Sequence, residues 1–197
     1  ETAIYGASEI SYLGDLSALY CGVINVSKAT KLVELIIGNH TEGYSNGNLH
    51  ELSIGTNRLL KTVDVTNCTG LSNALALTGC PNIENIYAKG TNITSVELPN
   101  SGYIRVIHLP GSVNTLNITN QLYIEELDID SYENIKSLCI DNCPTLDTVD
   151  ILEKCVNAER VRLTDVSWNI PDISFLQSLY HLKGLDENGL NTEDAYL

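Results

Sequence analysis

The sequence contains few basic residues and no long apolar run, and both absences narrow the classes of function. Lysine and arginine together number 11 against 25 acidic residues, which gives a net charge of −14. A surface with this balance cannot neutralise a row of phosphates, so we exclude nucleic acid as a partner and expect no attraction to an anionic membrane. No stretch approaches the ~20 apolar residues of a membrane-spanning helix, so we also predict no membrane insertion.

The sequence motifs of common catalytic and metal sites are missing as well. The four histidines, His40, His50, His108 and His181, are not spaced as metal ligands. There is no Gly-x-Ser-x-Gly elbow, no phosphate-binding loop and no His-Glu-x-x-His. We therefore predict a chain that is not an enzyme, with no catalytic residues, no metal site and no cofactor. Two alternatives stay open: a carbohydrate-active enzyme that uses two of the many carboxylates, and weak calcium binding by the acidic C-terminal third.

Six cysteines occur without a Cys-x-x-Cys motif, so they do not form a disulfide framework. Cys21 takes an inward apolar position, and Cys68, Cys80 and Cys143 each follow an apolar strand at a turn. Cys139 lies between two inward residues and is expected to face outward. We predict reduced, structural thiols, with a bridge between Cys68 and Cys80 as the alternative.

What the sequence does contain is a repeat about eleven residues long. Nearly the whole chain can be written as L-x-x-L-x-L, with Ile, Val or Ala in place of Leu. The middle apolar residues are separated by 11, 17, 11, 12, 11, 10, 11, 9, 11, 11, 11 and 12 positions. A fixed short period with apolar residues in every copy predicts a repeat solenoid of parallel β-strands. These middle residues are Ile24, Leu35, Leu52, Val63, Leu75, Ile86, Val96, Ile107, Leu116, Leu127, Leu138, Val149 and Val161.

The interruptions of the repeat divide the chain into three parts. Residues 1–22 do not fit the period, and Leu13 and the leucines after it predict a short helical cap over the end of the core. The solenoid is expected over 23–166, with an inserted loop at 38–48 that is rich in glycine and asparagine. A helical stripe after Pro171 predicts a C-terminal helical cap and tail over 167–197.

The alternation of two kinds of half-turn resembles a bacterial leucine-rich repeat. One kind is represented by 24–32 (INVSKATKL), 75–83 (LALTGCPNI) and 116–124 (LNITNQLYI), and the other by 86–93 (IYAKGTNI). The resemblance implies coils of 21–22 residues, each with an inner strand and an outer segment. Both half-turns have strand-like composition, which leaves two alternatives. The body could be flatter with strands on both faces, or the half-turns assigned as inner and outer could be exchanged.

The runs 12–17 (YLGDLS), 29–32 (ATKL) and 185–189 (LDENG) are similar to leucine-rich segments in structural proteins of tailed phages and prophages of gut bacteria. This resemblance implies a tail or baseplate setting and therefore an extracellular or virion-associated location.

The outward residues of the inner strands are the candidate binding surface. Tyrosine outnumbers phenylalanine ten to one, so aromatic side chains are placed where a hydroxyl can meet water or a partner. We expect Tyr87, His108 and Arg105 to be central contacts, a flank of aspartates to provide electrostatic attraction, and Tyr44 to be a loop contact. The outward row is Ile36, Asp64, Tyr87, His108, Asp128 and Asp150.

These features together predict a non-catalytic recognition module with a rigid sheet surface. The expected ligand is a protein or carbohydrate on a bacterial cell surface, or a neighbouring virion protein. The principal alternative is a structural spacer or assembly domain within a larger virion or fibre protein.

Overall fold

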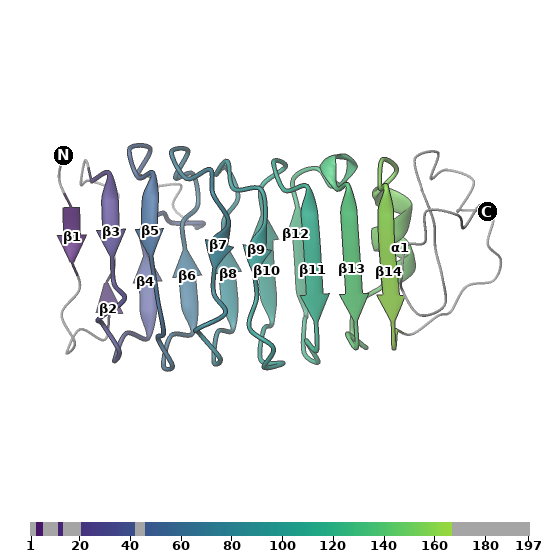
Figure 1. Ribbon diagram of the computed structural model, residues 1–197, viewed down its shortest axis with the longest axis horizontal. Helices are drawn as coiled ribbons and strands as arrows, with labels where there is room; N and C mark the ends of the chain where they lie inside the picture. Colours follow the sequence, from purple (N-terminus) through teal and green to yellow (C-terminus); the bar gives the residue numbers. More distant parts are fainter. Residues whose placement is uncertain (1–2, 6–11, 14–20, 42–45, 167–197) are drawn as a thin grey trace.

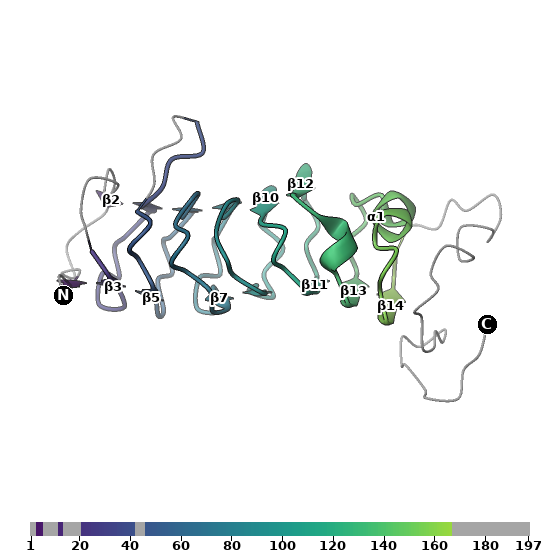
Figure 2. The same ribbon diagram turned by 90° about the horizontal axis from the view of Figure 1, so that it is seen from above.

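The computed structural model describes residues 3–5, 12–13, 21–41 and 46–166. Over these residues the chain winds into stacked coils of parallel strands, which is a β-solenoid (Figure 1). Two rows of strands lie on opposite sides of an elongated body (Figure 2). The predicted solenoid of parallel strands is therefore confirmed, and both half-turns of a coil form strands.

One row of strands forms a single six-stranded sheet, which we call the long sheet. Neighbouring strands of the long sheet are parallel, and a connection through the opposite face separates each strand from the next along the chain. Its strands are β2 (Tyr12–Leu13), β4 (Glu34–Ile36), β6 (Thr62–Asp64), β8 (Asn85–Tyr87), β10 (Val106–Leu109) and β12 (Glu126–Ile129).

The opposite row is divided into three smaller sheets, which we call the opposite face. The first contains β1 (Ala3–Tyr5), β3 (Val23–Asn25) and β5 (Glu51–Ser53). The second contains β7 (Leu75–Ala76) and β9 (Val96–Glu97). The third contains β11 (Thr115–Thr119), β13 (Ser137–Asp141) and β14 (Arg160–Thr164).

The apolar residue of each half-turn stacks on its equivalent in the next coil. In the long sheet, Leu35, Val63, Ile86 and Ile107 are paired in register and have no exposed surface. Burial of each such side chain stabilises the fold by about 1.5–3 kcal/mol. Because strand side chains alternate, the same register lines up the neighbouring residues on the outside of the sheet.

Asparagine side chains join successive coils at the turns. Nδ2 of Asn82 donates to the carbonyl of Arg58 at 2.6 Å, and Nδ2 of Asn134 donates to that of Gly111 at 2.6 Å. These partners are 24 and 23 residues apart, which is about one full coil. The amides thus satisfy turn carbonyls that no strand reaches.

The six cysteines are free thiols, so the alternative of a Cys68–Cys80 disulfide is wrong. Cys21, Cys68, Cys80 and Cys143 are buried as predicted, and Cys139 is half-buried. At the turns, the thiol of Cys143 donates to the carbonyl of Ile118 at 3.5 Å. Burial raises the pKa of Cys68 to about 11 and that of Cys155 to about 12, so both thiols stay protonated at neutral pH.

The strands begin earlier in the chain than the repeat predicts. Strand β1 pairs with β3, and β2 pairs with β4, with Leu13 opposite Leu35. Leu13 therefore lies in a strand and not in the expected cap helix. Backbone pairing with the following coil extends the solenoid into residues that do not show the L-x-x-L-x-L pattern. The rest of the predicted N-terminal cap lies outside the described residues.

A helix replaces the strand that the repeat predicts around Val149. Helix α1 (Thr148–Lys154) buries Thr148, Ile151 and Leu152. Its N-cap is Asp147, whose carboxylate accepts the backbone N–H of Asp150 at 3.1 Å. This cap satisfies a backbone donor of the first turn and favours the helix over a strand. Asp150 consequently leaves the row of strand residues in which it was predicted.

Two predicted features lie outside the described residues. They are the C-terminal helical cap over 167–197 and the tip of the inserted loop, including Tyr44. Among the residues that are described, no helix is long and apolar enough to cross a membrane.

Candidate functional site

The register of the long sheet aligns the predicted outward residues. Parallel pairing sets Ile36 beside Asp64, Asp64 beside Tyr87, Tyr87 beside His108, and His108 beside Asp128. The row therefore exists as a continuous strip across five strands. The residues of the row differ in solvent exposure, so only some of them can contact a ligand.

Asp64 is buried, contrary to its predicted place among the exposed contacts. Its residue exposure is 1%, and its carboxylate accepts three hydrogen bonds. Oδ1 accepts the backbone N–H of Thr66 at 2.9 Å, whereas Oδ2 accepts the backbone N–H of His40 at 2.9 Å and its ring Nδ1 at 2.7 Å. Three donors compensate the desolvation of the carboxylate, so Asp64 acts as an anchor for His40.

His40 comes from the inserted segment and covers the middle of the row. Its imidazole stacks on the phenol ring of Tyr87, with ring centroids 3.6 Å apart and planes inclined by 6°. The His40 side chain remains 35% exposed. His40 was not among the predicted contacts, because the apolar period does not describe the path of an insertion.

His108 extends the aromatic contact toward the next strand. Its ring meets that of Tyr87 edge-on, with centroids 5.2 Å apart and planes at 80°. Its Nε2 lies 2.8 Å from Oε1 of Glu126. Burial, and then the carboxylates of Asp64 and Glu126, raise the pKa of Tyr87 above its usual value. The Tyr87 phenol therefore stays neutral and keeps its proton as a donor.

An ion-pair cluster lies at the end of the row. Nζ of Lys89 lies 2.6 Å from Oδ2 of Asp128 and 3.1 Å from Oδ1 of Asp130. Burial alone would lower the pKa of Lys89, but the hydrogen bonds to both aspartates outweigh burial and raise the pKa. Lys89 therefore carries its charge, and the predicted acidic flank is partly neutralised at Asp128.

Possible metal ligands also meet in this region. One donor atom from each of His108, Glu126 and Asp128 lies within 4.8 Å of the other two. Glu126 already bonds His108, and Asp128 already bonds Lys89. A cation would therefore compete with two internal partners for these ligands.

The other predicted contacts lie at the border of the row. Arg105 precedes β10 and pairs with the carboxylate of Glu125. Asp150 lies on α1, where it bonds Lys154 at 2.5 Å. We call the combination of His40, Tyr87, His108, Glu126 and Asp128 the His–Tyr surface; His40 and Glu126 are exposed, and the other three are half-buried.

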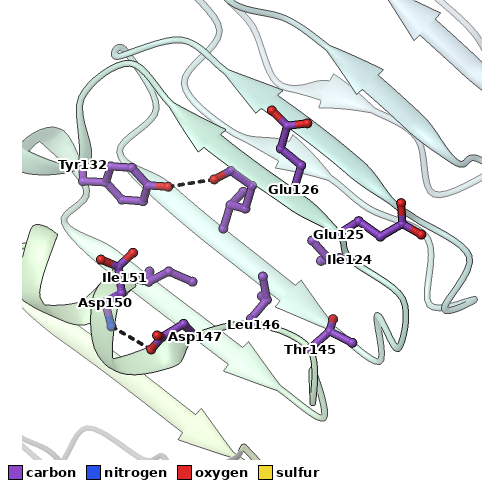
Figure 3. Close-up of a pocket in the computed structure, with 10 residues that line it drawn as sticks. Ile124, Glu125, Glu126, Tyr132, Thr145, Leu146, Asp147, Asp150 and Ile151 are labelled. Atoms are coloured by element: carbon purple, nitrogen blue, oxygen red, sulfur yellow. Dashed lines mark hydrogen bonds between the residues drawn. The ribbon is translucent and has the colours of Figure 1, made fainter.

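An open pocket of about 180 Å³ lies between β12 and α1 (Figure 3). Its apolar lining comes from both elements and from the turn before the helix, and its rim is acidic. The lining residues are Ile124, Glu125, Glu126, Leu127, Tyr132, Thr145, Leu146, Asp147, Asp150 and Ile151.

Comparison with known proteins adds no family to these observations. Neither a protein-family model nor a curated protein matches the sequence.

Proposed function

We propose that this chain is a non-catalytic recognition module whose His–Tyr surface binds a protein or glycan. The observation that carries the proposal is the stack of His40 on Tyr87, held by a buried carboxylate. A side chain from the insertion is fixed above the sheet by internal contacts, so the pair of rings is already ordered before a ligand binds. Such fixing favours a surface arranged for a ligand.

The chemistry of the surface suits polar recognition. Two imidazoles, a neutral phenol and the carboxylates of Glu126 and Asp128 offer donors and acceptors side by side. The aromatic rings add apolar area for a sugar face or an apolar side chain. Because internal contacts already order His40 and His108, binding would order few additional rotamers and therefore lose little entropy.

We place the module in a phage tail or another extracellular bacterial surface assembly, and we assign its coils to the bacterial type of leucine-rich repeat. The coil length of about 20–25 residues, seen in the bonds between coils, supports this assignment. Strands on both faces depart from the simplest form of that repeat.

The test is binding of the fluorescently labelled domain to intact cells from a panel of gut bacteria. We expect binding to some strains and its loss in the double variant Tyr87→Ala/His108→Ala. A matched control is Asn117→Ala/Arg162→Ala, which removes two exposed side chains from the opposite face. Circular dichroism of each variant checks that the solenoid is folded.

The outcomes separate recognition from a structural role. Binding that survives in the Tyr87/His108 variant would remove the His–Tyr surface from the proposal. Absence of binding to every strain, with a folded domain, would favour a spacer or assembly domain of a larger fibre protein.

A further inference from the structure

Among the described residues, the long sheet ends at β12, whereas the opposite face continues for two more strands, β13 and β14. Between β13 and β14 the chain crosses to the side of the solenoid that carries the long sheet, and there it forms helix α1 (Figure 2). No strand in the described part of the chain pairs with the outer edge of β12. The sheet is therefore interrupted at a place where the solenoid would otherwise add a strand.

The backbone of β12 presents alternate residues to this open edge. The N–H groups of Glu126 and Asp130 donate toward β10, to the carbonyls of Arg105 at 3.0 Å and Leu109 at 3.1 Å. In a parallel strand, every second residue directs its backbone groups to the same neighbour. The backbone groups of Leu127 consequently face away from β10. The hydroxyl of Tyr132 donates to the Leu127 carbonyl at 3.1 Å, in place of a strand N–H.

The pocket between β12 and α1 lies along this edge (Figure 3). Its apolar lining consists of Ile124, Leu127, Leu146 and Ile151. Alternate side chains of an extended segment could pack on this lining while its backbone pairs with the strand edge.

The acidic lining of the pocket indicates that a bound segment carries positive charge. Of its ten lining residues, four are acidic and none is basic. The counter-charges come from outside the lining, as with Lys154 on Asp150 and Arg105 on Glu125. Burial, and then the carboxylates of Asp128 and Asp150, raise the pKa of Tyr132 to about 12, which agrees with a negative potential at this end of the sheet.

We propose that the groove between β12 and α1 binds a short, extended segment of a partner protein that carries lysine or arginine, by strand addition to the edge of β12. The apolar side chains of the segment contact Leu127 and Ile151, and its basic side chains meet Glu126 and Asp150. Glu126 belongs to both this site and the His–Tyr surface, whereas the other residues of the two sites differ.

The test uses blocked pentapeptides and the ¹⁵N-labelled domain. The first peptide alternates valine with lysine, the second alternates valine with glutamate, and the third is the lysine peptide with alternate amides N-methylated. We expect saturable shifts of the Leu127 and Ile151 amide signals with the lysine peptide, and affinity at least about tenfold weaker for the other two peptides. Equal binding of the N-methylated peptide would overturn strand addition, because an ionic contact does not need those amides. Absence of a Leu127 shift with every peptide would also overturn it.

Two sets of variants locate the site. Glu126→Gln/Asp150→Asn should weaken the lysine peptide several-fold, whereas Glu51→Gln/Glu97→Gln, which removes two exposed carboxylates from the opposite face, should not. Equal weakening by both pairs would indicate general attraction to an acidic protein and contradict the proposal. The variant Tyr87→Ala/His108→Ala should retain peptide binding, so failure of the groove and failure of the His–Tyr surface are distinguishable.

Discussion

The imidazole of His40 lies flat on the ring of Tyr87, although 47 positions separate them in the chain and the two residues belong to different coils. Asp64, on the strand between them, binds His40 through both its ring and its backbone. These contacts among the three residues fix the start of the inserted loop to the long sheet.

Substitution of His40 should destabilise the domain. In His40→Ala the stack is lost and the buried carboxylate of Asp64 loses a donor, at an expected cost of about 1–3 kcal/mol in the free energy of unfolding. Urea denaturation measures the change. His50→Ala is the control, because the His50 side chain is exposed and its ring bonds the nearby carbonyl of Asn48. An equal loss in both variants would contradict the anchoring role of Asp64.

Gly38 should be needed to bring His40 to its position. A Cβ at Gly38 would lie 2.1 Å from the carbonyl oxygen of Thr66, whereas a Cβ at Gly47 meets only a threonine hydroxyl at 3.4 Å. Gly38→Ala must therefore displace the backbone that leads to His40, and Gly47→Ala need not. We expect Gly38→Ala to lower the denaturation midpoint and to shift the NMR signals of the Tyr87 ring. Unchanged ring signals in a folded Gly38→Ala protein would show that the contact is less restrictive than the geometry indicates.

Cys139 should react before the other cysteines. Burial raises the pKa of Cys139 as it does those of Cys68, Cys143 and Cys155, so access distinguishes the thiols: the last three are buried. Cys139 is half-buried on the outer surface of β13. Alkylation of the native protein at pH 8, followed by peptide mass spectrometry, should label Cys139 first. Cys139→Ser should remove the fast phase; rapid labelling of Cys68 would indicate that its turn opens.

Stability should fall at alkaline pH partly through Tyr132. Its pKa in the folded protein is about 12, whereas an unfolded tyrosine titrates near pH ~10. Below pH ~10 both states hold the proton and this contribution is fully present. As the pH rises toward 12, the unfolded state releases the proton first, and the contribution is lost. The difference in unfolding free energy between the wild type and Tyr132→Phe should therefore decrease across this window, as measured by urea denaturation. A constant difference would show that the phenol is not shielded in the fold.

The segment that forms helix α1 matches the repeat pattern, yet the repeat predicts a strand there and the structure has a helix. Leu146, Val149 and Ile151 match the L-x-x-L-x-L spacing, and the same segment also suits a helix that buries Ile151 and Leu152. The carboxylate of Asp147 on the N–H of Asp150 decides between the two. A capping aspartate three residues before another acid was the sequence signal that could have identified the helix.

The solenoid and the order of its outward row follow from the amino-acid sequence alone. Each half-turn carries its own apolar residues, and stacking equivalent coils brings equivalent positions into register, so a local period specifies repeated contacts. The tertiary structure decided where the period fails. The position of His40 depends on Asp64, 24 residues away. Within the described part of the chain, the edge of β12 is open because helix α1 replaces a strand. Both are unique contacts, and a repeating pattern carries no information about a contact that occurs once.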